Sequence, residues 1–316
     1  MDQQAALRRI EKILSHISLS DENQNGIDLN QCAAAQIESA QSGNILDEER
    51  QKASFPIQEM IHLLNGGELF TEMRRMVGSM LENDEVLRDP RRFDMSVPEI
   101  RKRTMEKVIY VLKRMSDVGE GEGIPRMGKS KQGKRAKATK GLSEAFFQVL
   151  SLYDPSWTTR IGVHFGLFLN AIQGQGTEEQ IKQFSEDVLS GRIFGCFAMT
   201  ELGHGSYIRG FETTATFDIE RQEFVINSPT ETSTKWWIGM AGHTATHCVA
   251  FARLLTKGED FGVHSFLVPL RNPDTGLALP GISIGDCGAK MGRNGIDNGW
   301  IQFHNVRVPR TNMLMR

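Results

Sequence analysis

The sequence predicts an α+β protein: an all-helical part followed by an antiparallel β-barrel or sandwich. Up to about residue 193, apolar residues recur at three- and four-residue steps, which is the spacing of one helical face. After Gly191, short alternating segments follow one another, separated by Gly, Pro, Asn and Asp turns, as in an antiparallel sheet. We therefore divide the chain into an N-terminal extension (1–45), a helical domain (46–193) and a β domain (194–316).

Composition narrows the classes of partner. The 316 residues carry a net charge of −2, so no overall positive field favours nucleic acid or an anionic membrane. No apolar run reaches the length of a membrane span. The four cysteines are scattered without a CxxC pair, which indicates free thiols and no zinc site. We expect neither nucleic-acid binding nor membrane insertion.

Capping signals and apolar stripes define the expected helices. Leu7 to Ile17 carries one stripe, and Met60 to Leu81 carries a second that Gly66 and Gly67 interrupt. Capping-box spacing predicts a helix from Val97 to Met115, and another that starts at Thr177 and stops at Ser190–Gly191.

The segment from Gly119 to Gly141 is basic, with seven Lys or Arg residues between Arg126 and Lys140. We interpret it as a solvated loop. The alternative is a contact with a phosphate or another polyanion, but no apolar strand leads into its GxGxG sequence.

The expected strands lie in the last third of the chain, with a hairpin turn at Asp218–Gln222. They are Phe194–Met199, Thr213–Phe217, Phe224–Ile226, Cys248–Leu254, Val263–Val268 and Trp300–Val306.

Two stretches are candidates for a ligand site. Gly195–Ser206 is an apolar run that ends in Thr200, Glu201 and bare glycines, a pattern that exposes backbone to a flat polar ligand. Thr234–Gly239 contains Trp236 and Trp237 and also ends on a glycine. Each residue has an ordinary alternative: the tryptophans as core, Thr200 as a strand-end hydroxyl and Glu201 as a solvated charge. Lys235 favours a rim, since core strands rarely begin with lysine.

No motif for metal-dependent or nucleophilic catalysis is evident. His243 and His247 are four residues apart, but they occupy a turn without a neighbouring carboxylate, so we expect no metal site. A nucleophile elbow, a Walker loop and a strand-borne GxGxxG are all missing from the sequence.

Five stretches resemble the peroxisomal acyl-CoA oxidases, and the similarity is continuous from about Leu152 to Arg316. They are Cys196–Ser206, Glu212–Asp218, Lys235–Gly239, Gly262–Pro269 and Gly295–Gly299. The resemblance implies the acyl-CoA dehydrogenase architecture, in which a helical domain, a middle β domain and a C-terminal helical bundle follow one another.

The same resemblance implies a bound FAD and assigns roles to four residues. Thr200 would hydrogen-bond the pyrimidine side of the flavin, Gly239 would pass its backbone close to the ring, and Trp237 would pack near it. Ser206 would contact the CoA moiety. Related dehydrogenases carry a hydroxyl residue at the position of Gly239, so its loss would leave room for oxygen beside the reduced flavin.

The implied reaction is α,β-dehydrogenation of a fatty acyl-CoA to the trans-2-enoyl-CoA, with oxygen reduced to hydrogen peroxide. In the family a glutamate of the C-terminal bundle removes the α proton. That bundle would lie beyond Arg316, and Glu201 should not take the glutamate's place. We expect a fragment of an oxidase that is a homodimer when complete. The alternatives are an acyl-CoA dehydrogenase or a truncated, non-catalytic paralogue that binds flavin or acyl-CoA.

Residues 9–17 resemble the N-terminal peroxisomal targeting signal, although Ile17 departs from the usual leucine or alanine. The resemblance implies a peroxisomal location and recognition by an import receptor. An ordinary amphipathic helix would show the same periodicity.

Overall fold

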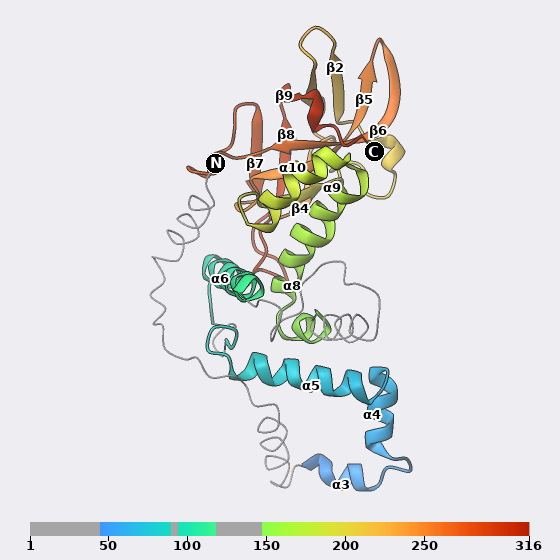
Figure 1. Ribbon diagram of the computed structural model, residues 1–316, viewed down its shortest axis with the longest axis vertical. Coiled ribbons are helices and arrows are strands. Elements are labelled where there is room, and N and C mark those ends of the chain that lie inside the picture. Colours follow the sequence, from blue (N-terminus) through green and yellow to red (C-terminus); the bar gives the residue numbers. More distant parts are fainter. Residues whose placement is uncertain (1–44, 90–93, 118–146, 316) are drawn as a thin grey trace. The chain divides into compact units, whose positions relative to one another are not determined.

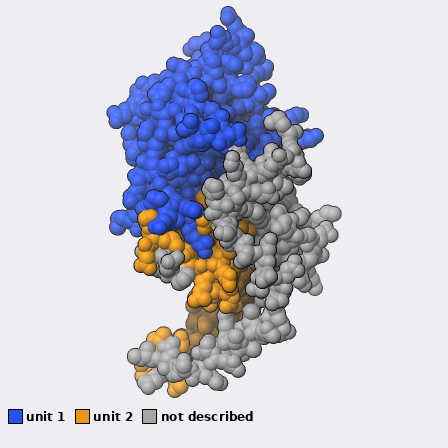
Figure 2. Space-filling view, turned by 90° about the vertical axis from the view of Figure 1, so that its left-hand side faces the viewer, with its two compact units in different colours: residues 1–18, 97–104, 159–316 blue, residues 19–96, 105–158 orange. Residues whose placement is uncertain are grey.

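A computed structural model describes residues 45–89, 94–117 and 147–315. Within these ranges the chain forms two compact units (Figure 2). One contains residues 97–104 and 159–315, and the other contains the described parts of 45–96 and 105–158. The expected helix at Leu7–Ile17 and the basic segment 119–141 lie outside the described residues.

The first helices are α3 (Ile45–Gln51), α4 (Ile57–Asn65), α5 (Glu68–Asn83) and α6 (Val97–Asp117) (Figure 1). The interruption predicted at Gly66–Gly67 is confirmed. Gly66 adopts a left-handed φ of 87° and ends α4, a conformation that glycine reaches without steric cost.

A buried lysine organises the smaller unit. The Nζ of Lys107 lies 3.1 Å from Oδ2 of Asp89 and 3.6 Å from Oδ2 of Asp154. Since a buried ammonium is costly unless it is paired, these two carboxylates compensate it. The three residues tie α6 to two segments distant in sequence.

The described helices between residue 147 and the first strand are α8 (Pro155–Ile161), the π-helix η1 (Gly162–Leu169), α9 (Asn170–Gln175) and α10 (Glu178–Leu189). The predicted capping box is present. The backbone N–H of Gln180 donates to Oγ1 of Thr177, and the N–H of Thr177 donates to Oε1 of Gln180. The helix ends at Leu189, just before Gly191 adopts a φ of 72°.

His164 of η1 joins the helices to the first strand. Its Nδ1 accepts a 3.2 Å hydrogen bond from the N–H of Gly195, so the proton resides on Nε2, which donates to the carbonyl of Val188. Burial lowers the pKa of His164 to about 4 and keeps the ring neutral.

The described strands form two sheets, and the α+β prediction is confirmed. The strands are β1 (Gly195–Ala198), β2 (Thr214–Asp218), β3 (Glu223–Asn227), β4 (Lys235–Gly239), β5 (His247–Thr256), β6 (Glu259–Pro269), β7 (Ile282–Asp286), β8 (Asn298–Phe303) and β9 (Val306–Pro309). One sheet runs β1-β5-β2-β3-β9 with β6 also on β5, and the other runs β4-β8-β7. Most pairs are antiparallel, but β5 pairs in parallel with β1 and with β2.

Three details differ from or add to the sequence prediction. The single strand expected at Trp300–Val306 is two strands, separated at Asn305, whose φ is 52°. Strands β4 and β7 are absent from the predicted strands. The hairpin turn at Asp218–Gln222 is confirmed by the antiparallel pairing of β2 and β3.

None of the described helices is long and apolar enough to cross a membrane.

The contact between η1 and β1 gives the first prediction. A Cβ at residue 195 would overlap the ring of Phe168, which is fully buried. Gly195→Ala should lower the free energy of unfolding by about 1–3 kcal/mol, because the ring must move within a packed core. Gly174→Ala is the control, since a Cβ there meets no atom within 4 Å and helical alanine is favoured over glycine. Urea denaturation of both variants measures the difference, and equal stabilities would contradict the prediction.

Candidate functional site

The two candidate stretches lie side by side and are joined directly by backbone hydrogen bonds. The N–H of Trp236 donates to the carbonyl of Thr200 (2.9 Å), and the N–H of Leu202 donates to the carbonyl of Thr234 (2.8 Å). An isolated antiparallel bridge joins Glu201 to Lys235. The end of β1 is thereby attached to the beginning of β4.

The residues expected to contact a ligand are at or near the surface of this junction. Thr200 and Ser206 are exposed, and the side chain of Trp237 is 53% exposed. Gly239 is half-buried. A hydroxyl and an aromatic ring therefore face solvent where the two stretches meet.

Trp237 holds an unusual backbone conformation. Its φ is 63°, in the left-handed region that bulky residues rarely occupy. The register between β4 and β8 shifts between Lys235 and Ile238, and Asn298 Nδ2 donates to the carbonyl of Trp237 (3.1 Å). Such a conformation costs on the order of 1–3 kcal/mol and persists only where the surroundings impose it. It leaves Trp237 exposed on a strand whose next residue, Ile238, is buried.

Gly239 is closely packed on the side where a side chain would start. A Cβ there would lie 3.1 Å from both Val163 of η1 and Ile296. The absence of a side chain at residue 239 therefore leaves no empty space on this side of the backbone, because Val163 and Ile296 already occupy it.

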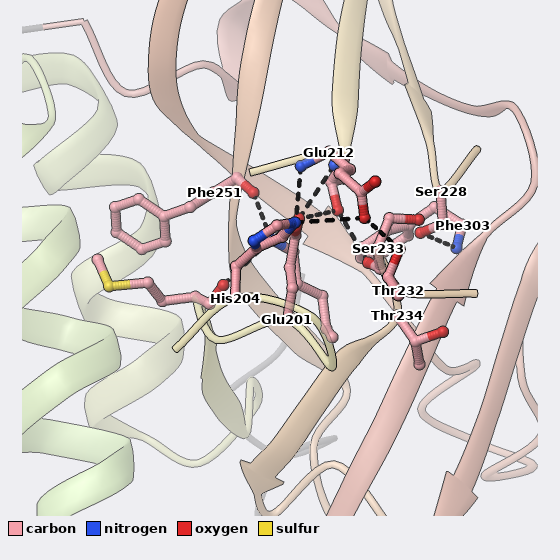
Figure 3. A network of polar contacts seen from close by, with 12 residues as sticks. Glu201, His204, Glu212, Ser228, Thr232, Ser233, Thr234, Phe251 and Phe303 are labelled. Atoms are coloured by element: carbon pink, nitrogen blue, oxygen red, sulfur yellow. Dashed lines mark hydrogen bonds and ion pairs between the residues drawn. The ribbon is translucent and has the colours of Figure 1, made fainter. Parts of the chain in front are cut away.

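Glu201, labelled in Figure 3, forms a fully buried ion pair with Lys235. Both side chains are 0% exposed, and their Nζ and Oε1 atoms are 3.0 Å apart. The ammonium also donates to the carbonyls of Phe251 (2.6 Å) and Met199 (3.2 Å). All three of its donors are thus satisfied, as burial requires.

Glu201 is equally well bonded on its own side. Oε2 accepts from the N–H of Glu212 (2.9 Å), and Oε1 accepts from the N–H (3.0 Å) and hydroxyl (2.6 Å) of Thr213. Burial lowers the pKa of Lys235 to about 8, and the carboxylate of Glu201 opposes that shift. The ring of Phe211 lies 4.5 Å from Nζ and adds a cation–π contact.

The far end of β4 is fixed by a second buried ion pair. Nη2 of Arg160 lies 2.8 Å from Oδ1 of Asp297, and both side chains are almost completely buried. Asp297 also accepts hydrogen bonds from the N–H groups of His243 (2.7 Å) and Thr244 (2.9 Å). The turn that follows Gly239 is therefore held by a carboxylate whose pKa is lowered, against the effect of burial, by Arg160.

Arg271 fixes the same turn from another direction. Its guanidinium donates to the carbonyls of Ala241, Gly242 and Ala245 at 2.8–2.9 Å. Met240 lies at the entry of this turn with a φ of 69°. Strand β4 is thus held at both ends by buried charges.

Two sequence arguments were wrong. Lys235, which was expected at the rim of the ligand site, is buried. Glu201, for which a solvated charge was the ordinary alternative, is buried as well. On β4 it is Trp237, within the bulge, that is exposed. No local signal in the sequence marks this buried pair, because the two residues are 34 positions apart.

The histidines do not converge on one site. His243 Nε2 lies 3.0 Å from Asp286, whereas His247 contacts the hydroxyl of Thr246. Among the described residues, Glu201, His204 and Glu212 bring potential ligand atoms within 4.8 Å of one another. Both oxygens of Glu201 are already used by protein donors, and Lys235 supplies the compensating charge. This cluster is therefore a charge network of the protein.

Two family models match the chain. The acyl-coenzyme A oxidase N-terminal model covers residues 56–194, and the acyl-CoA dehydrogenase middle-domain model covers residues 196–306. Acyl-coenzyme A oxidase 2 of Yarrowia lipolytica is 44% identical over 273 residues. That alignment covers 85% of this chain but 36% of the relative, so the chain spans little more than a third of that protein's length.

Solved structures agree with these matches. Acyl-CoA oxidase 1 from Yarrowia lipolytica superposes with a TM-score of 0.73 at 42% identity, over 86% of this chain and 37% of that protein. Acyl-CoA oxidase-1 of Caenorhabditis elegans, in a complex with FAD and ATP, gives a TM-score of 0.72 at 34% identity, over 92% and 41%. The chain therefore belongs to the acyl-CoA oxidase family and carries its N-terminal and middle domains.

Proposed function

We propose that this protein takes part in the FAD-dependent oxidation of fatty acyl-CoA to trans-2-enoyl-CoA, with oxygen reduced to hydrogen peroxide. The observation that carries the proposal is the junction of β1 and β4, where exposed Thr200 and Trp237 lie on adjoining stretches that both match the family. That chemistry is the first step of fatty-acid β-oxidation.

The junction fits a flavin. Thr200 offers a hydroxyl for the pyrimidine edge, Trp237 offers an exposed aromatic surface, and Gly239 offers backbone without a side chain. A related oxidase from C. elegans has been crystallised with FAD. When bound, FAD supplies the two-electron acceptor that the side chains of this protein lack.

Ser206 is the proposed contact for the CoA moiety. It is exposed on the loop that follows Glu201, and its carbonyl accepts from the N–H of Ile208 (3.0 Å). This hydrogen bond closes a tight turn in which Ser206 is exposed.

Glu201 cannot serve as the base that removes the α proton. It is fully buried, its oxygens accept four hydrogen bonds, and Lys235 neutralises it. We propose that the base is a glutamate encoded beyond Arg316, as the family resemblance implies.

The protein translated from the complete transcript tests the function. We expect it to bind FAD and to release hydrogen peroxide when supplied with a fatty acyl-CoA. Turnover only with an artificial electron acceptor would indicate an acyl-CoA dehydrogenase instead. A stop codon directly after Arg316, combined with flavin or acyl-CoA binding but no turnover, would indicate a binding protein.

Gly239 provides a test of oxygen use in the same active protein. We expect Gly239→Thr to slow turnover with oxygen more than turnover with an artificial acceptor, because the family resemblance implies that a hydroxyl at this position lies near the reactive nitrogen of the flavin. Gly239→Ala is the matched control, since both variants place a Cβ 3.1 Å from Val163 and Ile296 but only threonine adds the hydroxyl. Equal oxygen-to-acceptor ratios in the two variants would refute this role.

We propose a peroxisomal location, reached through an import receptor that reads residues 9–17 as an amphipathic helix. Residues 1–25 fused to a fluorescent protein should give a punctate signal that coincides with a peroxisomal marker. Replacing Arg9 and His16 by alanine in the same fusion should disperse it. A diffuse signal from the unmodified fusion would exclude this address. We further propose that the complete protein is a homodimer.

A further inference from the structure

We infer that Lys235 and Glu201 are positioning residues: together they set the backbone geometry that places Thr200 and Trp237 at the ligand surface. This inference rests on the proposed flavin site and extends it to two residues that cannot touch the ligand, since both are fully buried.

Lys235 contacts three segments of the chain around the site. Its ammonium donates to Met199 at the end of β1, to Glu201 directly after Thr200, and to Phe251 in the middle of β5. Thr200 therefore lies between two residues that the same ammonium holds. Since Lys235 itself begins β4, one side chain fixes three segments around the site.

Glu201 binds the backbone of the segment that leads into β2. Its carboxylate holds the N–H groups of Glu212 and Thr213, which lead into β2. The loop between Glu201 and Glu212, which carries Ser206, is thereby closed at both ends by one residue. Glu212 in turn accepts a hydrogen bond from Thr232 (Figure 3) and another from Thr230, and both threonines precede Lys235 in the chain.

Trp237 lies two residues after Lys235, inside the bulge where the register changes, and its left-handed φ must be imposed by its neighbours. Toward the start of β4, the bulge is constrained by the ammonium of Lys235, by the backbone pairing of Lys235 with Ile301 in β8, and by the hydrogen bond from Trp236 to Thr200. Releasing Lys235 should therefore let Trp237 relax toward an ordinary strand conformation.

Hydrogen exchange tests the inference without any ligand. In the 316-residue chain, Lys235→Met should speed exchange in peptides covering residues 200–206 and 232–239 relative to peptides of α10. Lys107→Met is the matched control, because Lys107 is an equally buried and paired lysine of the other compact unit. It should destabilise its own surroundings and leave the two site peptides unchanged. Unchanged exchange at the site in Lys235→Met would overturn the inference.

Flavin binding then separates positioning from stability. In the protein from the complete transcript, Lys235→Met should weaken FAD binding about 10- to 100-fold, the range known for outer-shell partners of metal ligands. The double variant Glu201→Gln/Lys235→Met removes the unpaired buried charge, so its melting temperature should recover in part; the amide NH2 still replaces one of the two oxygens that accept from Glu212 and Thr213. Its FAD affinity should stay low, because the anchors to Met199 and Phe251 are still lost.

Recovery of FAD affinity together with melting temperature would show that the pair only stabilises the fold, and would overturn the inference while leaving the proposed function intact. Failure of the unmodified protein to bind FAD would overturn both.

Discussion

The buried charges at the two ends of β4 govern the geometry of the site. Moving an ammonium, a guanidinium or a carboxylate out of water costs several kcal/mol, and only complete hydrogen bonding offsets the cost. Lys235 with Glu201 and Arg160 with Asp297 both meet that condition. Because each charged group must keep all its partners, the backbone segments that supply them have little freedom. Strand β4 can therefore sustain the strained conformations of Trp237 and Met240.

The π-helix η1, which precedes β1, also packs against the two candidate stretches. Phe168 of η1 fills the space beside Gly195, where a Cβ would overlap its ring, and Val163 of η1 lies 3.1 Å from the position of a Cβ at residue 239. His164 of the same π-helix accepts the N–H of Gly195 through a ring that burial keeps neutral. Gly195 is thus required by helix–strand packing within one compact unit, whereas the packing around Gly239 is tight but leaves room for a small shift.

Local chemistry explains which predictions were confirmed. The capping box at Thr177, the break at Gly66 and the turn at Asp218–Gln222 depend on residues within five positions of each other. Lys235 illustrates the opposite case, since its partners Met199 and Phe251 are 36 and 16 residues away. Nothing in its own neighbourhood separates a buried lysine from an exposed one, so the argument for a rim was wrong although Trp237 proved to be exposed.

The sequence by itself determined the α+β class and the two stretches that form the junction, because apolar periodicity and motif spacing are properties of neighbouring residues. Only the tertiary structure decided that Glu201 and Lys235 are a buried pair, and that Val163 and Ile296 close the space beside Gly239. Those facts depend on which distant segments pack together. Burial sets the free-energy cost of each charged residue, and it is a property of the folded chain as a whole.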